Sequence, residues 1–150
     1  MELVLLIGIQ ATGKSTFCRQ RFSETHVRLN LDMLRTRHRE WLLFSACLEA
    51  GQPVVIDNTN PTRAERDRYV RPAIEAGFSV VGYFFESRLR DAIRRNSSRP
   101  ELRRVPDRGI VGTSNRLERP AFDEGFRDLF FIRINETSGG FDVEEWRDEI

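Results

Sequence analysis

The sequence predicts an α/β domain whose mainly parallel sheet has five strands and carries helices on both faces. Short apolar runs alternate along the chain with longer segments of helical periodicity, as in a parallel sheet with crossover helices. The first run, Leu3–Ile7, contains no polar residue and is typical of a strand buried on both faces. The length of 150 residues is that of one domain, which we expect to span residues 1–150.

The expected elements follow one another in a regular order. Strands are expected at Leu3–Ile7, Val27–Asn30, Pro53–Asp57, Ser79–Phe85 and Leu129–Ile134. Helices are expected at Thr16–Phe22, Met33–Ala50, Thr62–Ala76 and Arg88–Ser98. The tail, Asn135–Ile150, is polar and acidic, and we expect one short helix from Val143. In a parallel sheet of this kind the active site lies at the carboxyl ends of the strands.

Composition argues against several classes of protein. The net charge of +1 gives no overall attraction to nucleic acid or membrane, so any such attraction must be local. No apolar run approaches the roughly 18 residues of a membrane span, and Glu2 stands where a signal peptide has basic residues. Cys18 and Cys47 lie on apolar helical faces without metal-ligand spacing, so we expect reduced core cysteines in a cytoplasmic protein with no membrane partner.

Lysine occurs once among the 24 basic residues, at Lys14, and all the others are arginine. Lys14 lies in the segment 8–15, GIQATGKS, which fits the phosphate-binding loop pattern GxxxxGK[ST]. A strand before this loop and a helix after it would turn backbone N–H groups and the helix N-terminus toward phosphates. We therefore expect a bound nucleoside triphosphate, the alternative being an ordinary glycine-rich turn that matches by accident. The loop residues expected to bind it are Gly8, Gln10, Ala11, Thr12, Gly13, Lys14, Ser15 and Thr16.

Two oxygen ligands for Mg²⁺ are expected beside the loop. The Ser15 hydroxyl follows the lysine, as in other phosphate-binding loops. Asp57 ends the third expected strand, where a carboxylate faces the metal or its waters. The alternative for Asp57 is a turn residue that caps the following helix.

Asp32 and Arg35 follow the second expected strand and share a helical face if a helix begins there. A carboxylate beside the γ-phosphate could accept a proton from an attacking hydroxyl, and an arginine beside it could hold an anionic acceptor. Spacing alone equally allows an exposed ion pair of little energetic importance.

Residues 88–108 hold eight arginines against three carboxylates in an otherwise neutral chain. Arg88, Arg95 and Arg99 recur on one helical stripe before Pro100 ends the helix. Such a segment can close over the β- and γ-phosphates and stabilise the charge in transfer. Two alternatives stay open at this point, a nucleic-acid backbone site and a solvated helix face.

With these residues in hand, the chain resembles the kinase domain of phage and bacterial polynucleotide 5′-kinases and of the animal kinase-phosphatase. Three blocks carry the resemblance, namely Gly8–Thr16, Asn30–Arg35 and Ile56–Pro61, and a fourth, Arg95–Arg99, is similar to the lid arginines of the family. The resemblance covers residues 3 to about 106 and leaves the tail unmatched. It implies a three-layer P-loop kinase fold with an arginine-rich lid at about residues 88–120.

The resemblance also implies roles on the donor side of the site. Lys14 and Ser15 would hold the phosphates of ATP and Mg²⁺, and Asp57 would support the metal or its neighbours. Arg95 and Arg99 would contact the donor phosphates in the transition state. The cofactors implied are ATP and Mg²⁺.

On the acceptor side, Asp32 would be the general base on a ribose or deoxyribose 5′-OH. Arg35 would grip the phosphate on the 3′ side of that acceptor. The five residues with catalytic roles are then Lys14, Asp32, Arg35, Arg95 and Arg99.

We therefore expect ATP-dependent phosphoryl transfer, with the 5′-OH end of DNA or RNA as acceptor and a separate end-healing phosphatase or ligase as a partner. One alternative is a kinase for a small hydroxylated metabolite or antibiotic. Another is a nucleotide-binding module that transfers nothing. A GTPase switch is disfavoured because the guanine signature Asn-Lys-x-Asp needs a lysine other than Lys14.

Overall fold

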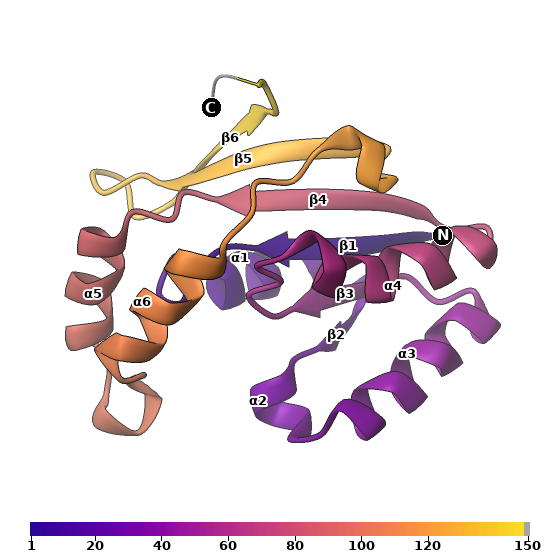
Figure 1. The fold of residues 1–150 in the computed structure, drawn as a ribbon, viewed down its shortest axis with the longest axis horizontal. Helices are drawn as coiled ribbons and strands as arrows, with labels where there is room; N and C mark the ends of the chain where they lie inside the picture. Colours follow the sequence, from indigo (N-terminus) through magenta and orange to yellow (C-terminus); the bar gives the residue numbers. More distant parts are fainter. Residues whose placement is uncertain (149–150) are drawn as a thin grey trace.

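The computed structural model describes residues 1–148, which form one six-stranded sheet with the order β2-β3-β1-β4-β5-β6 (Figure 1). The strands are β1 (Glu2–Ile7), β2 (Val27–Leu29), β3 (Val54–Asp57), β4 (Ser79–Phe85), β5 (Asp128–Ile134) and β6 (Phe141–Glu145). The first five are parallel, and β6 runs antiparallel to β5. The predicted α/β class is confirmed, but the number of strands is six rather than five.

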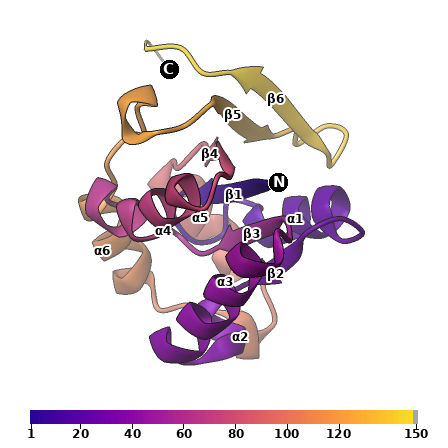
Figure 2. The same cartoon turned by 90° about the vertical axis from the view of Figure 1, so that its right-hand side faces the viewer.

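The helices connect successive parallel strands and flank the sheet (Figures 1 and 2). They are α1 (Lys14–Phe22), α2 (Leu31–Leu34), α3 (Arg37–Ala50), α4 (Arg63–Glu75), α5 (Leu89–Ser97) and α6 (Asp107–Arg116), with short 3₁₀ turns η1 (Glu101–Arg103) and η2 (Phe122–Glu124). Within residues 1–148, no helix combines the length and the apolar character that crossing a bilayer requires.

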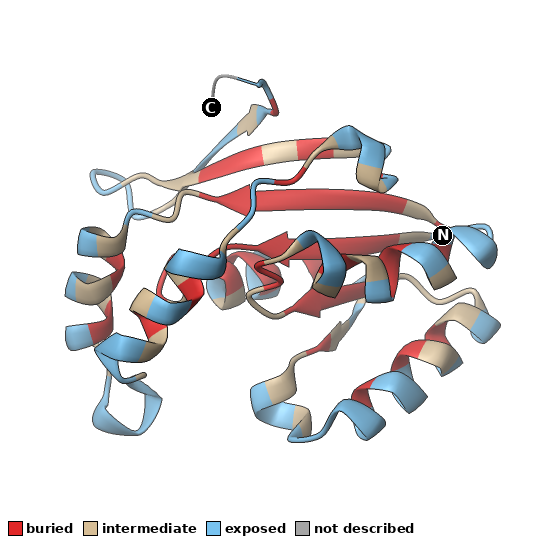
Figure 3. Cartoon of the chain, viewed as in Figure 1, coloured by how far each residue is buried: buried red, intermediate tan, exposed pale blue. Residues whose placement is uncertain are grey.

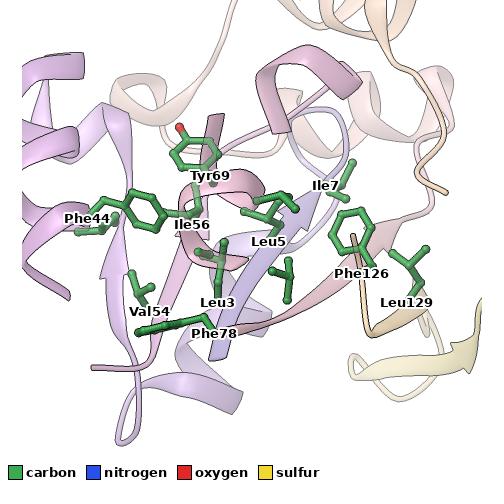
Figure 4. Close-up of a cluster of buried hydrophobic side chains, with 14 of the residues drawn as sticks. Leu3, Leu5, Ile7, Phe44, Val54, Ile56, Tyr69, Phe78, Phe126 and Leu129 are labelled. Atoms are coloured by element: carbon green, nitrogen blue, oxygen red, sulfur yellow. The ribbon is translucent and has the colours of Figure 1, made fainter. Parts of the chain in front are cut away.

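The core lies on both faces of the sheet because alternate residues of β1 point in opposite directions. Leu3, Leu5 and Ile7 pack with Phe44 of α3 and Tyr69 of α4 in one cluster (Figure 4). The intervening residues of β1 join a second cluster against α1. The central strands are consequently buried almost throughout, while the outer faces of the helices are exposed (Figure 3). The apolar run at the start of the chain is a strand covered on two sides, as predicted.

The helix predicted over Met33–Ala50 is wrong in one respect, because it is divided into α2 and α3. Arg35 ends α2 with a φ of 77°, a backbone conformation that residues other than glycine rarely adopt. Thr36 then caps α3, its hydroxyl accepting a hydrogen bond from the Arg39 N–H at 3.1 Å. The break separates Asp32 from the long helix and leaves it in the short helix that directly follows β2.

The short helix predicted from Val143 is also wrong, since this residue belongs to β6. Phe141 and Val143 alternate with charged residues, and the strand pairs with the outer edge of β5. Trp146 follows β6 and meets the ring of Phe84 edge-on, with 5.4 Å between ring centroids. Residues 149–150 of the predicted tail helix lie outside the described part of the chain.

The segment after β4 folds into an α5–α6 pair. Ala92 of α5 and Ile110 of α6 share a small buried cluster with Ile9 of the phosphate-binding loop. The Asn96 amide donates to the Val105 carbonyl at 2.6 Å and accepts from the Val105 N–H at 3.0 Å. The intervening loop is therefore closed at its base. The predicted lid region contains a helix, α6, that the sequence pattern did not indicate.

Candidate active site

The loop between β1 and α1 has the backbone geometry that anion binding needs. Gly8 and Gly13 have φ values of 152° and 95°, and Ala11 has a φ of 62°. A side chain at Gly8 would place its Cβ 3.1 Å from the Phe85 Cβ, so the loop can lie this close to β4 only with glycine there. No side chain caps the first turn of α1. The N–H groups at this helix end therefore have no side-chain acceptor, and a phosphate could accept from them.

Lys14 is buried against its own loop, and its ammonium donates to the Gly8 carbonyl at 2.8 Å and to the Ile9 carbonyl at 2.6 Å. Burial lowers the pKa of Lys14 from 10.5 to about 8, with Arg99 acting in the same direction and the Asp57 carboxylate opposing them. A bound triphosphate would reverse this balance because its negative charge favours the ammonium form.

The carboxylate of Asp57 lies beside the start of α1. Asp57 is 2% exposed, and its Oδ2 accepts from the Ser15 hydroxyl at 2.9 Å. The same oxygen accepts from Nε of Arg28 at 2.8 Å, and Nη2 of Arg28 lies 2.8 Å away. The two predicted magnesium ligands thus meet at the carboxyl end of β3, together with a guanidinium from β2.

Asp32 is held near this carboxylate by a cap that bridges two strands. Asn30, at the end of β2, accepts from the Met33 N–H at 3.1 Å and donates to the Asp57 carbonyl at 2.6 Å. The Leu31 N–H donates to the Asn58 side chain at 3.0 Å. The bonds to the Asp57 carbonyl and to the Asn58 side chain fix the first turn of α2, which carries Asp32, to the end of β3.

Two adjoining pockets open over these residues, with volumes of about 850 and 340 Å³. The smaller pocket lies over the phosphate-binding loop and includes Lys14 and Asp57. The larger lies between α1, α2 and the loop after α5. Both include Ser15, Asn30, Leu31, Asp32, Arg99, Arg103 and Val105. Asp32 therefore lies at the junction of a loop pocket and a second, larger pocket.

Residues 3–120 match the model of a protein family described as the AAA domain. The chain belongs to this family. It is also 27% identical over 132 residues to a bifunctional polynucleotide phosphatase/kinase of Schizosaccharomyces pombe. That alignment covers 85% of this chain but only 32% of the yeast protein, so the chain spans about a third of its relative. The resemblance drawn from the motifs is confirmed.

Three solved structures share the fold of this AAA domain. Kti12 of Chaetomium thermophilum in complex with ADP-AlF₃ gives a TM-score of 0.68 at 16% identity, covering 91% of this chain and 93% of that one. A chain of the Pnkp1/Rnl/Hen1 RNA repair complex gives 0.64 at 23% identity, with coverages of 77% and 43%. A sugar kinase from Janibacter sp. HTCC2649 gives 0.64 at 20% identity, with coverages of 87% and 85%. The P-loop kinase fold is therefore established.

Most of the residues predicted from the sequence line the two pockets of the AAA domain. Lys14, Asp57 and Gln10 lie in the smaller pocket, and Arg35 lies in the larger one. Ala11 also lines the smaller pocket and Thr16 the larger. Gly8, Thr12 and Gly13 form the loop itself without lining either pocket.

The two predicted lid arginines differ in position. Arg99 lines both pockets, and its pKa is lowered by burial and by nearby Arg103, with Asp32 opposing these effects. Arg95 lines neither pocket, and its guanidinium lies 2.9 Å from Glu136 in the turn between β5 and β6. Of the two, Arg99 alone therefore lines the pocket over the phosphate-binding loop.

The sequence motifs give no role to Arg28 or to the polar network that supports the turn after β3. Asn58 donates to Glu40 at 2.9 Å, and the Tyr69 hydroxyl donates to the same carboxylate at 2.7 Å. Burial, followed by the contact with Glu40, raises the pKa of Tyr69 to about 12, so the phenol stays a donor. A polar residue directly after a buried strand was the available signal for Asn58, whereas no local pattern marks Arg28.

A second buried group holds the other end of that turn. Arg66 is fully buried, and its guanidinium donates to both oxygens of Glu124 at 2.7 and 3.0 Å. It also donates to the carbonyls of Asn60, Pro61 and Glu118. The turn from Asp57 to Pro61 is therefore fixed from both sides.

The residues beside the loop fit a Mg²⁺ ion delivered with a nucleotide. A hydroxyl and a carboxylate oxygen, the ligand types that Mg²⁺ prefers, lie 2.9 Å apart at Ser15 and Asp57. Among the described residues, no group of three or more His, Cys, Asp or Glu side chains could hold a metal alone. This set suits an ion whose remaining ligands are phosphates and water.

Proposed function

We propose that this AAA domain transfers the γ-phosphoryl group of ATP to the 5′-hydroxyl end of a nucleic acid. The observation that carries the proposal is the charge of the larger pocket. Six arginines line it against a single carboxylate, Asp32. Such a lining favours an acceptor that carries phosphates. The arginines are Arg19, Arg28, Arg35, Arg99, Arg103 and Arg104.

The donor triphosphate would lie on the loop and the N-terminus of α1. Lys14 would leave the carbonyls of Gly8 and Ile9 and bind phosphate oxygens instead, as a compact point charge. Ser15 and Asp57 would hold Mg²⁺, which, when bound, neutralises charge on the β- and γ-phosphates. Arg99 would approach the transferring group from the lid side and stabilise the charge that develops there.

The acceptor hydroxyl would enter from the larger pocket. Asp32, at the junction of the two pockets, would accept its proton as the oxygen attacks the γ-phosphorus, while the bond from that phosphorus to the bridging oxygen breaks and ADP leaves. Arg35 would bind the phosphate on the 3′ side of the acceptor nucleotide and so orient the 5′-hydroxyl. The unusual φ of 77° at Arg35 supports this role, because strained backbone is often retained where a side chain must be aimed.

We extend the proposal to partners. The yeast relative is described as both a phosphatase and a kinase, and one structural neighbour belongs to an RNA repair complex. Phosphatase or ligase activities that heal the same nucleic-acid ends are therefore the expected companions of this kinase.

The test is transfer of labelled phosphate from ATP to a 5′-hydroxyl oligonucleotide, with the same oligonucleotide already 5′-phosphorylated as the control. We expect label only on the 5′-hydroxyl form, and parallel DNA and RNA oligonucleotides distinguish the two acceptors. A mononucleotide with a 3′-phosphate should be accepted better than the nucleoside, and Arg35→Gln should remove that difference.

A small-molecule kinase is the second candidate, favoured by the shared fold of the sugar kinase neighbour. Phosphorylation of a neutral sugar such as glucose, with no transfer to oligonucleotides, would replace the nucleic-acid proposal. ATP hydrolysis that neither class of acceptor stimulates would instead indicate a module without transfer.

A further inference from the structure

Arg28 contacts both residues that are expected to hold the metal. Its Nε and Nη2 each lie 2.8 Å from the same oxygen, Oδ2 of Asp57. Nη2 also lies 3.4 Å from the Ser15 hydroxyl oxygen. One guanidinium therefore lies beside both oxygen ligands, against the carboxylate oxygen that a metal ion would use.

The sheet fixes this arrangement. Arg28 is the register partner of Val55 in the parallel pair of β2 and β3, and Asp57 lies two residues beyond Val55. Residues two apart on a strand share a face, so Arg28 and Asp57 emerge on the same side of the sheet. The carboxylate is buried, with its side chain 2% exposed, whereas that of Arg28 is 31% exposed and lines the larger pocket.

We infer that Arg28 is a positioning residue that substitutes for the metal cation until the nucleotide arrives. The inference rests on the proposed donor site, because it assumes that Mg²⁺ uses Ser15 and Asp57. A divalent cation approaching the nucleotide-free protein must compete with a guanidinium for Oδ2 of Asp57. The cation is also repelled by the positive charge of Lys14. This lysine lies close enough to Asp57 for the carboxylate to oppose the lowering of its pKa.

The nucleotide changes this competition. A triphosphate supplies negative charge and further oxygen ligands, so the metal arriving with it can displace Arg28 from the shared oxygen. The larger pocket of about 850 Å³ gives the guanidinium room to move away. Arg28 thereby disfavours metal binding without nucleotide and keeps a buried carboxylate paired in its absence.

The test is Mn²⁺ binding to the full chain without nucleotide, measured by electron paramagnetic resonance of the free ion. We expect Arg28→Gln to bind Mn²⁺ at least about tenfold more tightly than the unmodified protein. The double variant Arg28→Gln/Asp57→Asn should lose this gain, because the freed carboxylate is then absent. Arg19→Gln is the matched control, since Arg19 lines the same pocket but makes no bond to Asp57.

Three results would overturn the inference. They are unchanged Mn²⁺ affinity in a folded Arg28→Gln variant, an equal gain in Arg19→Gln, or a gain that survives the Asp57 change. Thermal unfolding followed by circular dichroism establishes that each variant is folded. If Arg28→Gln does not fold, Arg28→Lys serves in its place, and its shorter ammonium should give a smaller gain. Since no acceptor enters the measurement, the result does not depend on which molecule is phosphorylated.

Discussion

Binding of ATP to this domain should take up protons at Lys14. The pKa of Lys14 is lowered to about 8 by burial, so a fraction of the ligand-free molecules holds a neutral amine at moderately alkaline pH. A bound triphosphate favours the ammonium and raises that pKa. The folded protein without ligand therefore binds fewer protons at this residue than the complex does, and affinity must fall as pH rises.

The size of the effect follows from the pKa of about 8. Complex formation should take up about a tenth of a proton at pH 7, about half at pH 8 and about nine tenths at pH 9. The fraction of protein with charged Lys14 falls about tenfold between pH 7 and pH 9, and the affinity for Mg·ATP should fall by the same factor.

Isothermal titration calorimetry in buffers of different ionisation enthalpy measures this uptake directly, because the apparent enthalpy varies linearly with that of the buffer. The phosphates of ATP cannot produce the signal, since a phosphate group with a second pKa of about 6 is already ionised at pH 8. Asp32→Asn is the control and should show the same uptake. Proton uptake near zero at pH 9, or an affinity that does not change from pH 7 to pH 9, would refute the reasoning.

Three further predictions concern the remaining groups of the site and the turn after β3. Asp32→Asn should lower the transfer rate by about 10²–10⁴-fold while nucleotide affinity is preserved, measured by single-turnover kinetics and equilibrium binding; near-normal turnover would remove the assignment as base. Glu136→Gln should release Arg95, whose side chain is 23% exposed, and tighten ATP binding severalfold, as expected for a partly exposed ion pair of up to about 1 kcal/mol. Arg95→Gln should weaken it, and no change in either variant would exclude Arg95 from donor contacts. Arg66→Met should cost about 3–5 kcal/mol in urea unfolding because it leaves buried Glu124 unpaired. Adding Glu124→Leu should recover most of that loss, and an equally unstable double variant would contradict this account.

Local sequence patterns were sufficient wherever one short segment determines its own structure. The residues Leu3–Ile7 are fully buried, as a strand without polar residues requires. The segment 8–15 adopts the loop that its glycine and lysine spacing predicts, with α1 beginning at Lys14. The helix expected at Thr62–Ala76 is α4, and Thr62 caps it by accepting from the Glu65 N–H.

The errors occur where structure depends on partners far away in the sequence. Strand β6 exists because β5 offers an open edge, and its alternating residues alone do not separate it from a short acidic helix. Arg35 takes a positive φ that no local preference of arginine favours. Arg28 and Asp57 are 29 positions apart, so their contact follows only from the register of β2 against β3.

The single lysine of the chain can now be explained by geometry. Arginine suits a site such as that of Arg66, where its planar fork contacts both oxygens of Glu124. Lys14 has a different task, since its ammonium lies against the carbonyls of Gly8 and Ile9 within its own loop and is 8% exposed. A buried guanidinium such as that of Arg66 is held by a carboxylate and three carbonyls around its planar fork, whereas the Lys14 ammonium is held by two successive carbonyls of one tight loop. The loop therefore requires a compact charge on a flexible stem, which explains why lysine occurs here in a chain that otherwise uses arginine.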